Sequence, residues 1–388
     1  MPYRARKSPL RHLVWIIPLL VLDFFIFRWL ALRQGGCQPT PTPLPIMTVA
    51  DADSLPPPPV WQAMVAPTPQ TNLLHPDEPG VLMPTGSGRL VSAKYGSTRT
   101  VKRGSRYLAS FHEGVDIAPV QRNRRGGAED SVYAVAAGRV AFVNASAGAS
   151  NYGKYVVLEH PDPSLGHISR RDGSTHPAVV YTLYAHLADV RFGLRPGQTV
   201  DPGDVIGTVG HTSNTRPPIP RGRSHLHWEI GVMLQSRYEA RSREHKTQNP
   251  FGNYNGGNLF GLDPLDFYAA HVRDPGLTMA TYMASVPPAA EVVLRGRYPD
   301  FFRRFPALWS GAAYDGRPLW IAMSESGVPL AGRNATPEEV KLLGNRRYAV
   351  VRAYPETIGR NGRRFFTSVK GTWDFSSRGR QWADLLLY

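Results

Sequence analysis

From about Arg89 onward, the chain consists of short runs of strand-forming residues separated by glycine- and asparagine-rich turns. The clearest runs are residues 131–136, 139–143, 155–160, 179–186, 205–209 and 225–230. Runs of this length between turn residues are typical of β-strands, and no long stretch of helical periodicity interrupts them. The sequence therefore predicts a β-dominated fold for this part of the chain.

Ionisable side chains gather at three places in this region, residues 111–117, 181–187 and 224–230. Alternate residues of a strand share a face, so His225, His227 and Glu229 point one way and the apolar residues between them point the other. His112 and Asp116 are four residues apart and also share a face where that segment is extended. A sheet that serves only as a scaffold has no need of such a row of ionisable groups.

These side chains have the composition of a zinc site. Two imidazoles and one carboxylate are a common ligand set for catalytic zinc, and a fourth position is left for water or substrate. The chain has one cysteine, Cys37, which excludes an intrachain disulfide and a cysteine-based zinc cluster. More groups are present than the ligands that such a site requires, which leaves two for acid, base or transition-state roles: His112, Asp116, His186, His225 and His227.

Each motif taken alone also fits an ordinary structural role. A His-x-His pair on a strand is often incidental, a His–Asp hydrogen bond is common on loops, and His186 in an apolar run fits a half-buried histidine. The combination, in this order and on strand-like segments, is more specific than any one of its parts.

Together the motifs resemble those of the lysostaphin-type, or LytM-like, zinc endopeptidases that cut peptidoglycan. The family pattern is His-x-x-x-Asp, then Tyr-x-His on a strand, then His-Leu-His with an aromatic and an acidic residue after it. The matching segments are residues 112–116, 184–186 and 225–229. Flanking segments of the family are matched by residues 95–99, 135–140, 152–160, 197–207 and 263–265. The resemblance covers the chain from Arg89 to about Tyr268.

The resemblance implies that residues 86–270 form a lysostaphin-type, antiparallel β-sheet or barrel-like catalytic domain. It implies that His112, Asp116 and His227 hold Zn²⁺ and that His186 and His225 are the catalytic histidines. One histidine would orient or deprotonate the zinc-bound water and the other would donate to the oxyanion, and which does which stays open. Glu229 would either support a ligand or be a strand-surface acid.

The function implied is that of a zinc-dependent metalloendopeptidase that hydrolyses stem peptides or cross-links of bacterial peptidoglycan. The alternative is a non-hydrolytic LytM-like regulator or wall-binding protein that activates another cell-wall hydrolase. The formal charge of +15 favours an anionic partner. No recognition helix, zinc finger or RNA-reading motif is present, so we expect no nucleic-acid partner.

The N-terminal region predicts export. Residues 1–11 are basic and are expected to form a cytoplasmic tail, and residues 12–32 are apolar enough for a transmembrane anchor, although Asp23 interrupts them. A cleaved signal peptide and a lipoprotein signal ending at Cys37 are the alternatives. Residues 33–85 are expected to form a proline-rich linker. We therefore expect a single-pass protein of the cytoplasmic membrane, with its later domains in the periplasm or cell envelope.

Residues 271–388 are expected to form a small α+β accessory domain, with a helix at residues 336–343 that Thr336 caps. Its basic pairs, residues 303–304, 346–347 and 363–364, fit either a solvated face or attachment to an anionic wall. Enlarged loops at residues 121–130, 161–177 and 215–223 are expected to shape or block access to the site.

Overall fold

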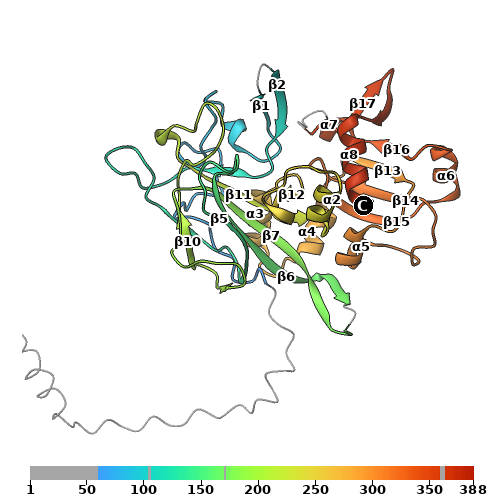
Figure 1. Cartoon of the computed structure of the whole chain (residues 1–388), viewed down its shortest axis with the longest axis horizontal. Helices are drawn as coiled ribbons and strands as arrows, with labels where there is room; N and C mark the ends of the chain where they lie inside the picture. The colour runs from blue at the N-terminus through green and yellow to red at the C-terminus, as the bar shows by residue number, and fades with distance from the viewer. Residues whose placement is uncertain (1–59, 104–105, 170–171, 359–362) are drawn as a thin grey trace, which may run out of the picture. The chain divides into compact units, whose positions relative to one another are not determined.

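An antiparallel sheet lies at the centre of the computed structural model (Figure 1). Its strand order is β12-β11-β7-β6-β5-β9, and β3 pairs with β11 beside β12. The strands are β3 Val115–Ile117, β5 Gly138–Asn144, β6 Lys154–Ser169, β7 Thr175–Leu187, β9 Thr199–Val200, β11 Leu226–Met233 and β12 Leu259–Leu262. Since all pairings between named strands are antiparallel, the predicted β-dominated, antiparallel fold is confirmed.

The structure describes residues 60–103, 106–169, 172–358 and 363–388. Residues Pro58–Tyr388 form one compact unit. The predicted cytoplasmic tail, the predicted anchor at residues 12–32 and the first part of the predicted linker lie outside the described residues. Among the helices of the described ranges, none combines the length and the apolar character that crossing a bilayer requires.

Smaller elements surround the central sheet. Two further antiparallel sheets consist of β1 Thr98–Arg103 with β2 Arg106–Phe111, and of β4 Ser131–Tyr133, β10 Val205–Thr208 and β8 Asp189–Val190. The helices of this half are α2 Tyr238–Glu244, α3 Pro264–Arg273 and α4 Met279–Ser285, and the 3-10 turns are η1 Leu90–Ala93, η2 Arg221–Arg223 and η3 Gly252–Tyr254. The predicted runs at residues 131–136 and 205–209 thus include real strands.

Alternation along the central strands divides the sheet into two buried faces. Tyr184 of β7 and Trp228 of β11 are cross-strand partners, and both belong to the main core. Tyr181 and Leu183 belong to a separate cluster on the other face, together with Tyr155 of β6. The ionisable residues of β11 alternate with Trp228, so they lie on the face of the smaller cluster.

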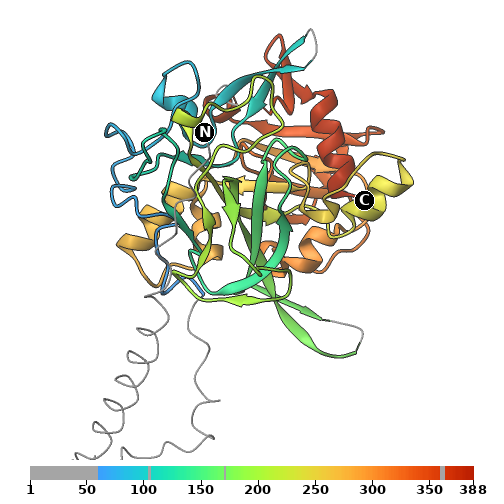
Figure 2. The same cartoon turned by 60° about the vertical axis from the view of Figure 1, so that its left-hand side comes forward.

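The enlarged loop expected at residues 161–177 is a continuation of β6 and β7 into a long hairpin (Figure 2). Asp162 in this hairpin accepts a hydrogen bond of 2.7 Å from Trp61 Nε1. Gly166, with a φ of 99°, lies so close to Pro306 that an added Cβ would be 2.4 Å from its Cγ. The hairpin therefore packs against the C-terminal part of the chain at η4, Pro306–Leu308.

The last part of the predicted linker is folded rather than extended. Trp61, Leu73 and Leu82 are buried in the main core. Leu82 forms a β-bridge with Ile117, and Met83 N donates to the carbonyl of Asp116 at 2.9 Å. Apolar residues between the prolines bury enough surface to outweigh the extended preference of a proline-rich segment. Residues 82–83 thus brace the strand that carries Asp116.

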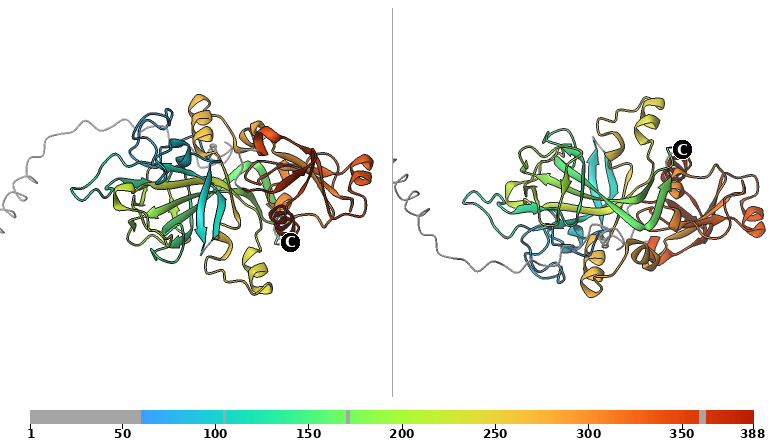
Figure 3. Two further views of the ribbon diagram at one scale, coloured as in Figure 1. Left: turned by 90° about the horizontal axis from the view of Figure 1, so that it is seen from above. Right: turned by 90° about the horizontal axis from the view of Figure 1, so that it is seen from below.

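A second group of elements follows (Figure 3). Its four-stranded sheet has the order β15-β14-β13-β16, with β13 Ala290–Leu294, β14 Leu319–Met323, β15 Pro329–Asn334 and β16 Tyr348–Ala353. A hairpin and four helices complete it: β17 Phe366–Val369, β18 Thr372–Phe375, α5 Asp300–Arg304, α6 Pro337–Leu343, α7 Pro355–Ile358 and α8 Ser377–Leu386. Thr336 and Glu339 form a capping box at the start of α6, so the predicted helix is confirmed.

Three arginines of the predicted basic pairs make specific contacts with other segments, and one of them, Arg347, is also exposed. Arg304 donates to the carbonyls of Met233 and Leu234, both at 2.9 Å. Arg347 forms an ion pair with Asp384 at 3.0 Å. Arg363 forms an ion pair with Glu113, next to His112. The residues after 290 are therefore joined to the central sheet by specific polar contacts.

Candidate metal and catalytic site

His112, Asp116 and His227 meet at one buried point. Asp116 of β3 is the cross-strand partner of His227 in β11, and His112 stands just before β3. His112 Nε2 lies 3.1 Å from Asp116 Oδ1 and 3.0 Å from His227 Nδ1, and the latter two atoms are 3.1 Å apart. The structure thus brings His227 together with two side chains that precede it by more than a hundred positions.

A close backbone contact makes this convergence possible. Gly114 lies against β11, and a Cβ at this position would be 2.2 Å from the carbonyl oxygen of Trp228. Real Cβ atoms do not approach a carbonyl so closely, so only glycine allows the segment to dock here. This contact sets the distance of His112 and Asp116 from His227.

The outer nitrogens of both histidines are held by acceptors. His112 Nδ1 is 2.9 Å from the carbonyl oxygen of Lys94, and His227 Nε2 is 2.8 Å from Glu229 Oε1. Because a carbonyl and a carboxylate only accept, these nitrogens carry the hydrogen, and the lone pairs of His112 Nε2 and His227 Nδ1 face the cluster. Ligand atoms about 2.0–2.2 Å from a tetrahedral zinc are about 3.3 Å apart, so the observed donor set fits this ion.

Glu229 supports His227 from behind. It is fully buried, and besides His227 it accepts hydrogen bonds from Tyr152 Oη at 2.7 Å and Tyr181 Oη at 3.0 Å. These donors and His227 hold the pKa of Glu229 below its usual value, although burial opposes this. Of the two roles that the sequence left open for Glu229, the structure favours support of a ligand.

Arg99 is a site residue to which the sequence analysis assigned no role. Its Nη2 donates to Asp116 Oδ2 at 2.5 Å, and its Nε donates to the carbonyl of Ser92 at 2.9 Å. Burial alone would raise the pKa of Asp116, but Arg99 and His112 hold it well below its usual range. The one signal in the sequence was the family-like segment at residues 95–99, which contains this arginine.

His186 and His225 lie beside the cluster. Their ring centroids are 4.8 Å apart, and His186 is 5.8 Å from His227 by the same measure. His225 Nε2 is 3.5 Å from Asp116 Oδ2. His186 Nδ1 is 2.9 Å from the carbonyl oxygen of Thr212, and His225 Nδ1 is 2.8 Å from that of Arg223. Each therefore carries its hydrogen on Nδ1 and has its Nε2 lone pair available.

His186 reaches the site through an unusual backbone conformation. Its neighbour Ala185 is the cross-strand partner of His227, so strict alternation would turn His186 to the opposite face of the sheet. His186 has a φ of 61°, which is rare for a residue other than glycine. This left-handed residue at the end of β7 turns the imidazole toward His225. Local backbone strain of this kind is common at functional sites.

The four histidines differ in their affinity for protons. Burial and Arg99 lower the pKa of His112 to about 4, and burial with the neighbouring His225 lowers that of His186 well below its usual value. Burial also lowers the pKa of His225. For His227, burial is outweighed by hydrogen bonds to Asp116 and Glu229, which raise its pKa to about 9. The proton that His227 holds in addition lies on Nδ1 beside Asp116, and a bound cation would displace it and take up the Nδ1 lone pair.

Comparison of the sequence with family profiles gives a match to peptidase family M23 over residues 110–240. We refer to these residues as the M23 domain, after the family profile that they match. The predicted resemblance to the lysostaphin-type enzymes is therefore confirmed. The M23 domain contains all the predicted ligands and catalytic histidines.

Solved structures similar to this chain include several M23 proteins. A zinc-containing peptidase from Vibrio cholerae is 23% identical over 34% of this chain and 31% of that one, with a TM-score of 0.22. The catalytic domain of lysostaphin from Staphylococcus simulans is 21% identical over 45% of this chain and 87% of that one, with a TM-score of 0.24. A prophage-encoded M23 protein of Enterococcus faecalis is 21% identical over 34% of this chain and 80% of that one, with a TM-score of 0.21.

The chain spans less than a third of the Vibrio cholerae peptidase. No curated protein sequence matches it. The assignment of the M23 domain consequently rests on the family match at residues 110–240 and not on these structures.

Proposed function

We propose that this protein is a zinc-dependent endopeptidase that hydrolyses peptide bonds of bacterial peptidoglycan. The observation that carries the proposal is the convergence of His112 Nε2, Asp116 Oδ1 and His227 Nδ1 within 3.0–3.1 Å of each other. The M23 domain makes a peptidase the expected activity. We add two elements to what the family match supports, namely the zinc ion and the peptidoglycan substrate.

His112, Asp116 and His227 would hold the ion. Zn²⁺ in this place would supply a Lewis acid for the scissile carbonyl and a bound water whose pKa is near 7. The chain itself fixes the ligands: Lys94 and Glu229 set the ring orientations of the two histidines, and Arg99 keeps Asp116 ionised. A ligand set held in this way loses little conformational freedom when the ion binds.

In this proposal, His186 and His225 accept and donate protons. Both present an Nε2 lone pair, because Nδ1 is committed to a backbone carbonyl. The carboxylate of Asp116 lies 3.5 Å from His225 Nε2 and stabilises its protonated form. We therefore assign His225 as the general base, and His186 would stabilise the developing oxyanion once its Nε2 has taken up a proton.

The alternative of a non-hydrolytic regulator has no observation in its favour. The convergence of His112, Asp116 and His227, with His186 beside His225, supports hydrolysis over this alternative. Cellular location is also part of the proposal. Peptidoglycan lies outside the cytoplasmic membrane, so this function requires export, for which the apolar segment at residues 12–32 remains the proposed anchor.

Digestion of purified sacculi tests the proposal. The zinc-loaded protein should release peptide fragments with new amino termini, which mass spectrometry identifies, and His225→Ala should release none. Synthetic stem peptides provide a second substrate in the same assay. A protein that carries zinc and leaves both the sacculi and the peptides intact would overturn the proposal.

A further inference from the structure

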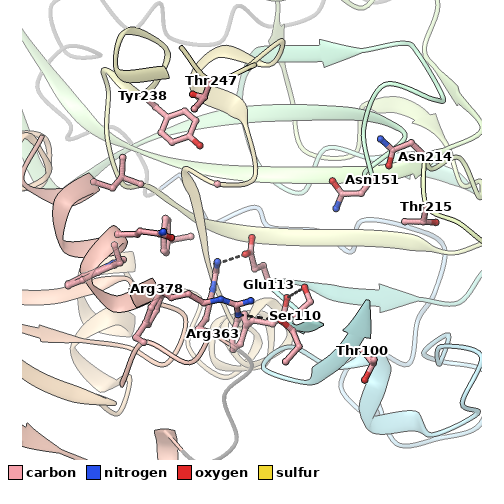
Figure 4. Close-up of a pocket in the computed structure, with 18 of the residues that line it drawn as sticks. Thr100, Ser110, Glu113, Asn151, Asn214, Thr215, Tyr238, Thr247, Arg363 and Arg378 are labelled. Atoms are coloured by element: carbon pink, nitrogen blue, oxygen red, sulfur yellow. Dashed lines mark hydrogen bonds and ion pairs between the residues drawn. The ribbon is translucent and has the colours of Figure 1, made fainter. Parts of the chain in front are cut away.

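A large cavity lies between the M23 domain and the C-terminal elements (Figure 4). Its volume is about 1440 Å³, whereas pockets for small ligands usually have about 300–1,000 Å³. The M23 side contributes Glu113, Asn151 and Asn214, and the C-terminal side contributes Arg363 and Arg378. A space of this size accommodates an extended peptide.

The cavity borders the catalytic site along three segments. Glu113 directly follows His112. Asn151 precedes Tyr152, whose ring centroid is 5.6 Å from that of His227. Asn151 is also held by Ser213, whose Oγ donates to its carbonyl at 2.9 Å, and the neighbouring Thr212 carbonyl accepts from His186. These neighbouring residues place the cavity within reach of a substrate bound at the catalytic histidines.

The lining of the cavity is strongly basic. Four arginines contribute to it, from four different segments: Arg216, Arg241, Arg363 and Arg378. Among the described lining residues, Glu113 is the one acidic side chain, and it forms an ion pair with Arg363. Arg216 belongs to the loop at residues 215–223 that the sequence singled out as a candidate for shaping access. The excess of positive charge predicts an anionic ligand.

The uncharged residues of the lining favour a peptide over a nucleic acid. Asn151, Asn214 and Gln381 offer amide groups that match a peptide backbone. Among the described aromatic residues of the lining, Tyr238 is the one that is partly exposed, which provides no row of faces for stacked bases; the buried ones are Phe111, Phe260, Phe365 and Trp382. Guanidinium groups bind carboxylates through paired hydrogen bonds.

We propose that this cavity is a substrate subsite that binds the free carboxylates of an acidic peptide next to the scissile bond. The inference rests on the proposed function, because it concerns the substrate of the same site. It gives residues 271–388 a role, since they form one wall of the subsite. That wall is fixed to the M23 domain by the ion pair of Arg363 with Glu113, and Arg378 Nη1 donates to the carbonyl of Ala109, just before the domain, at 3.3 Å.

The test compares two peptides of identical sequence with the full-length protein. One peptide has free side-chain and C-terminal carboxylates, and the other has all of them amidated. The test variant is Arg216→Gln with Arg241→Gln. The matched control is Arg221→Gln with Arg243→Gln, which removes two exposed arginines from the same loop and the same helix, neither of which lines the cavity.

Binding is measured by fluorescence anisotropy with forms of both peptides that have a reduced, uncleavable scissile bond, and KM is measured with the cleavable forms. We expect the wild-type protein and the control to bind the acidic peptide at least about tenfold more tightly than the amidated one. The test variant should lose this preference, with a rise in KM for the acidic peptide.

Equal binding of both peptides by the wild-type protein would overturn the inference, as would an unchanged preference in the test variant. Displacement by short polyphosphate chains, without binding of the acidic peptide, would also overturn it. If the binding preference behaves as expected but no peptide is cleaved, the subsite stands and the proposed hydrolytic function fails. If the protein cleaves the acidic and the amidated peptide equally well, the hydrolytic function stands and the proposed subsite fails.

Discussion

Asp116 lies directly opposite His227 in the antiparallel pairing of β3 with β11, and Asp116 Oδ1 is 3.1 Å from His227 Nδ1. A three-residue strand thus delivers the carboxylate to the partner histidine by backbone pairing alone. Arg99 and Glu229 then hold the outer atoms of the two side chains. The site is built into the sheet, and its geometry depends on contacts that can be changed one at a time.

Replacement of Glu229 by Gln should weaken zinc binding. The carboxylate accepts from His227 Nε2 at 2.8 Å and raises the basicity of the ring, and loss of such a support typically lowers metal affinity by about 10–100-fold. Competition with a zinc chelator measures the affinity. Glu239→Gln, on the exposed side of α2, is the control and should leave the affinity unchanged. Equal affinities in all three proteins would refute the supporting role of Glu229.

Gly114→Ala should damage the site although it removes no polar group. The new Cβ would collide with the carbonyl of Trp228 and push residues 112–116 away from β11, at a cost of about 1–3 kcal/mol in the free energy of unfolding. Zinc content should fall together with stability. Gly148→Ala, where an added Cβ has open space, is the control. A Gly114→Ala protein with full zinc content and normal stability would contradict the role of this close contact.

The buried His160 should make the protein less stable in mild acid. Burial lowers its pKa to about 4, below the usual 6.5, and its Nδ1 is held at 2.8 Å from the carbonyl of Ala137. The unfolded chain therefore binds a proton first, so stability is unaffected above pH 6.5 and declines as the pH falls from 6.5 toward 4. This one group should cost about 2 kcal/mol between pH 7 and pH 5.

Urea denaturation at the two pH values measures this loss, and comparison with a His160→Gln variant isolates it from other groups. The variant should lose about 2 kcal/mol less than the wild-type protein between pH 7 and pH 5. His75→Gln, at an exposed position, should behave like the wild type. The same pH dependence in the wild type and in His160→Gln would show that His160 does not contribute.

Trp61→Ala should destabilise the M23 domain, because the end of the proline-rich region is part of its core. Trp61 is 1% exposed, and its ring centroid is 5.2 Å from that of Phe267. Loss of such a side chain costs about 3–5 kcal/mol in the free energy of unfolding. Phe192→Ala, at a fully exposed position, should change stability by less than about 0.5 kcal/mol. A Trp61→Ala protein as stable as the wild type would place residues 60–85 outside the folding unit.

Much of the central sheet could be predicted from local patterns. Alternation placed His227 and Glu229 on one face of β11, because side-chain direction in a regular strand depends only on position. The same rule predicts the wrong face of the sheet for His186, because its left-handed backbone turns the side chain toward the other histidines. Proline content concealed the buried Trp61, because composition does not reveal which apolar residues find partners. These are effects of tertiary contacts, which no local pattern contains.

The C-terminal residues show the same limit. Charge patterning grouped Arg304 and Arg363 on a basic face, but the structure uses them to join distant segments. A basic pair looks the same in the sequence whether its partner is water or a buried carboxylate. The cavity between the two halves of the described unit was equally out of reach, because its lining comes from segments far apart in the chain.

The zinc content of the purified protein and of its ligand variants tests the central claim most directly. Elemental analysis should find about one zinc ion per wild-type chain, as in other sites with this ligand set. His112→Ala, Asp116→Ala and His227→Ala should each lose nearly all of it, while His167→Ala, on the hairpin away from the site, should retain it. Full zinc content in the three ligand variants would contradict the account.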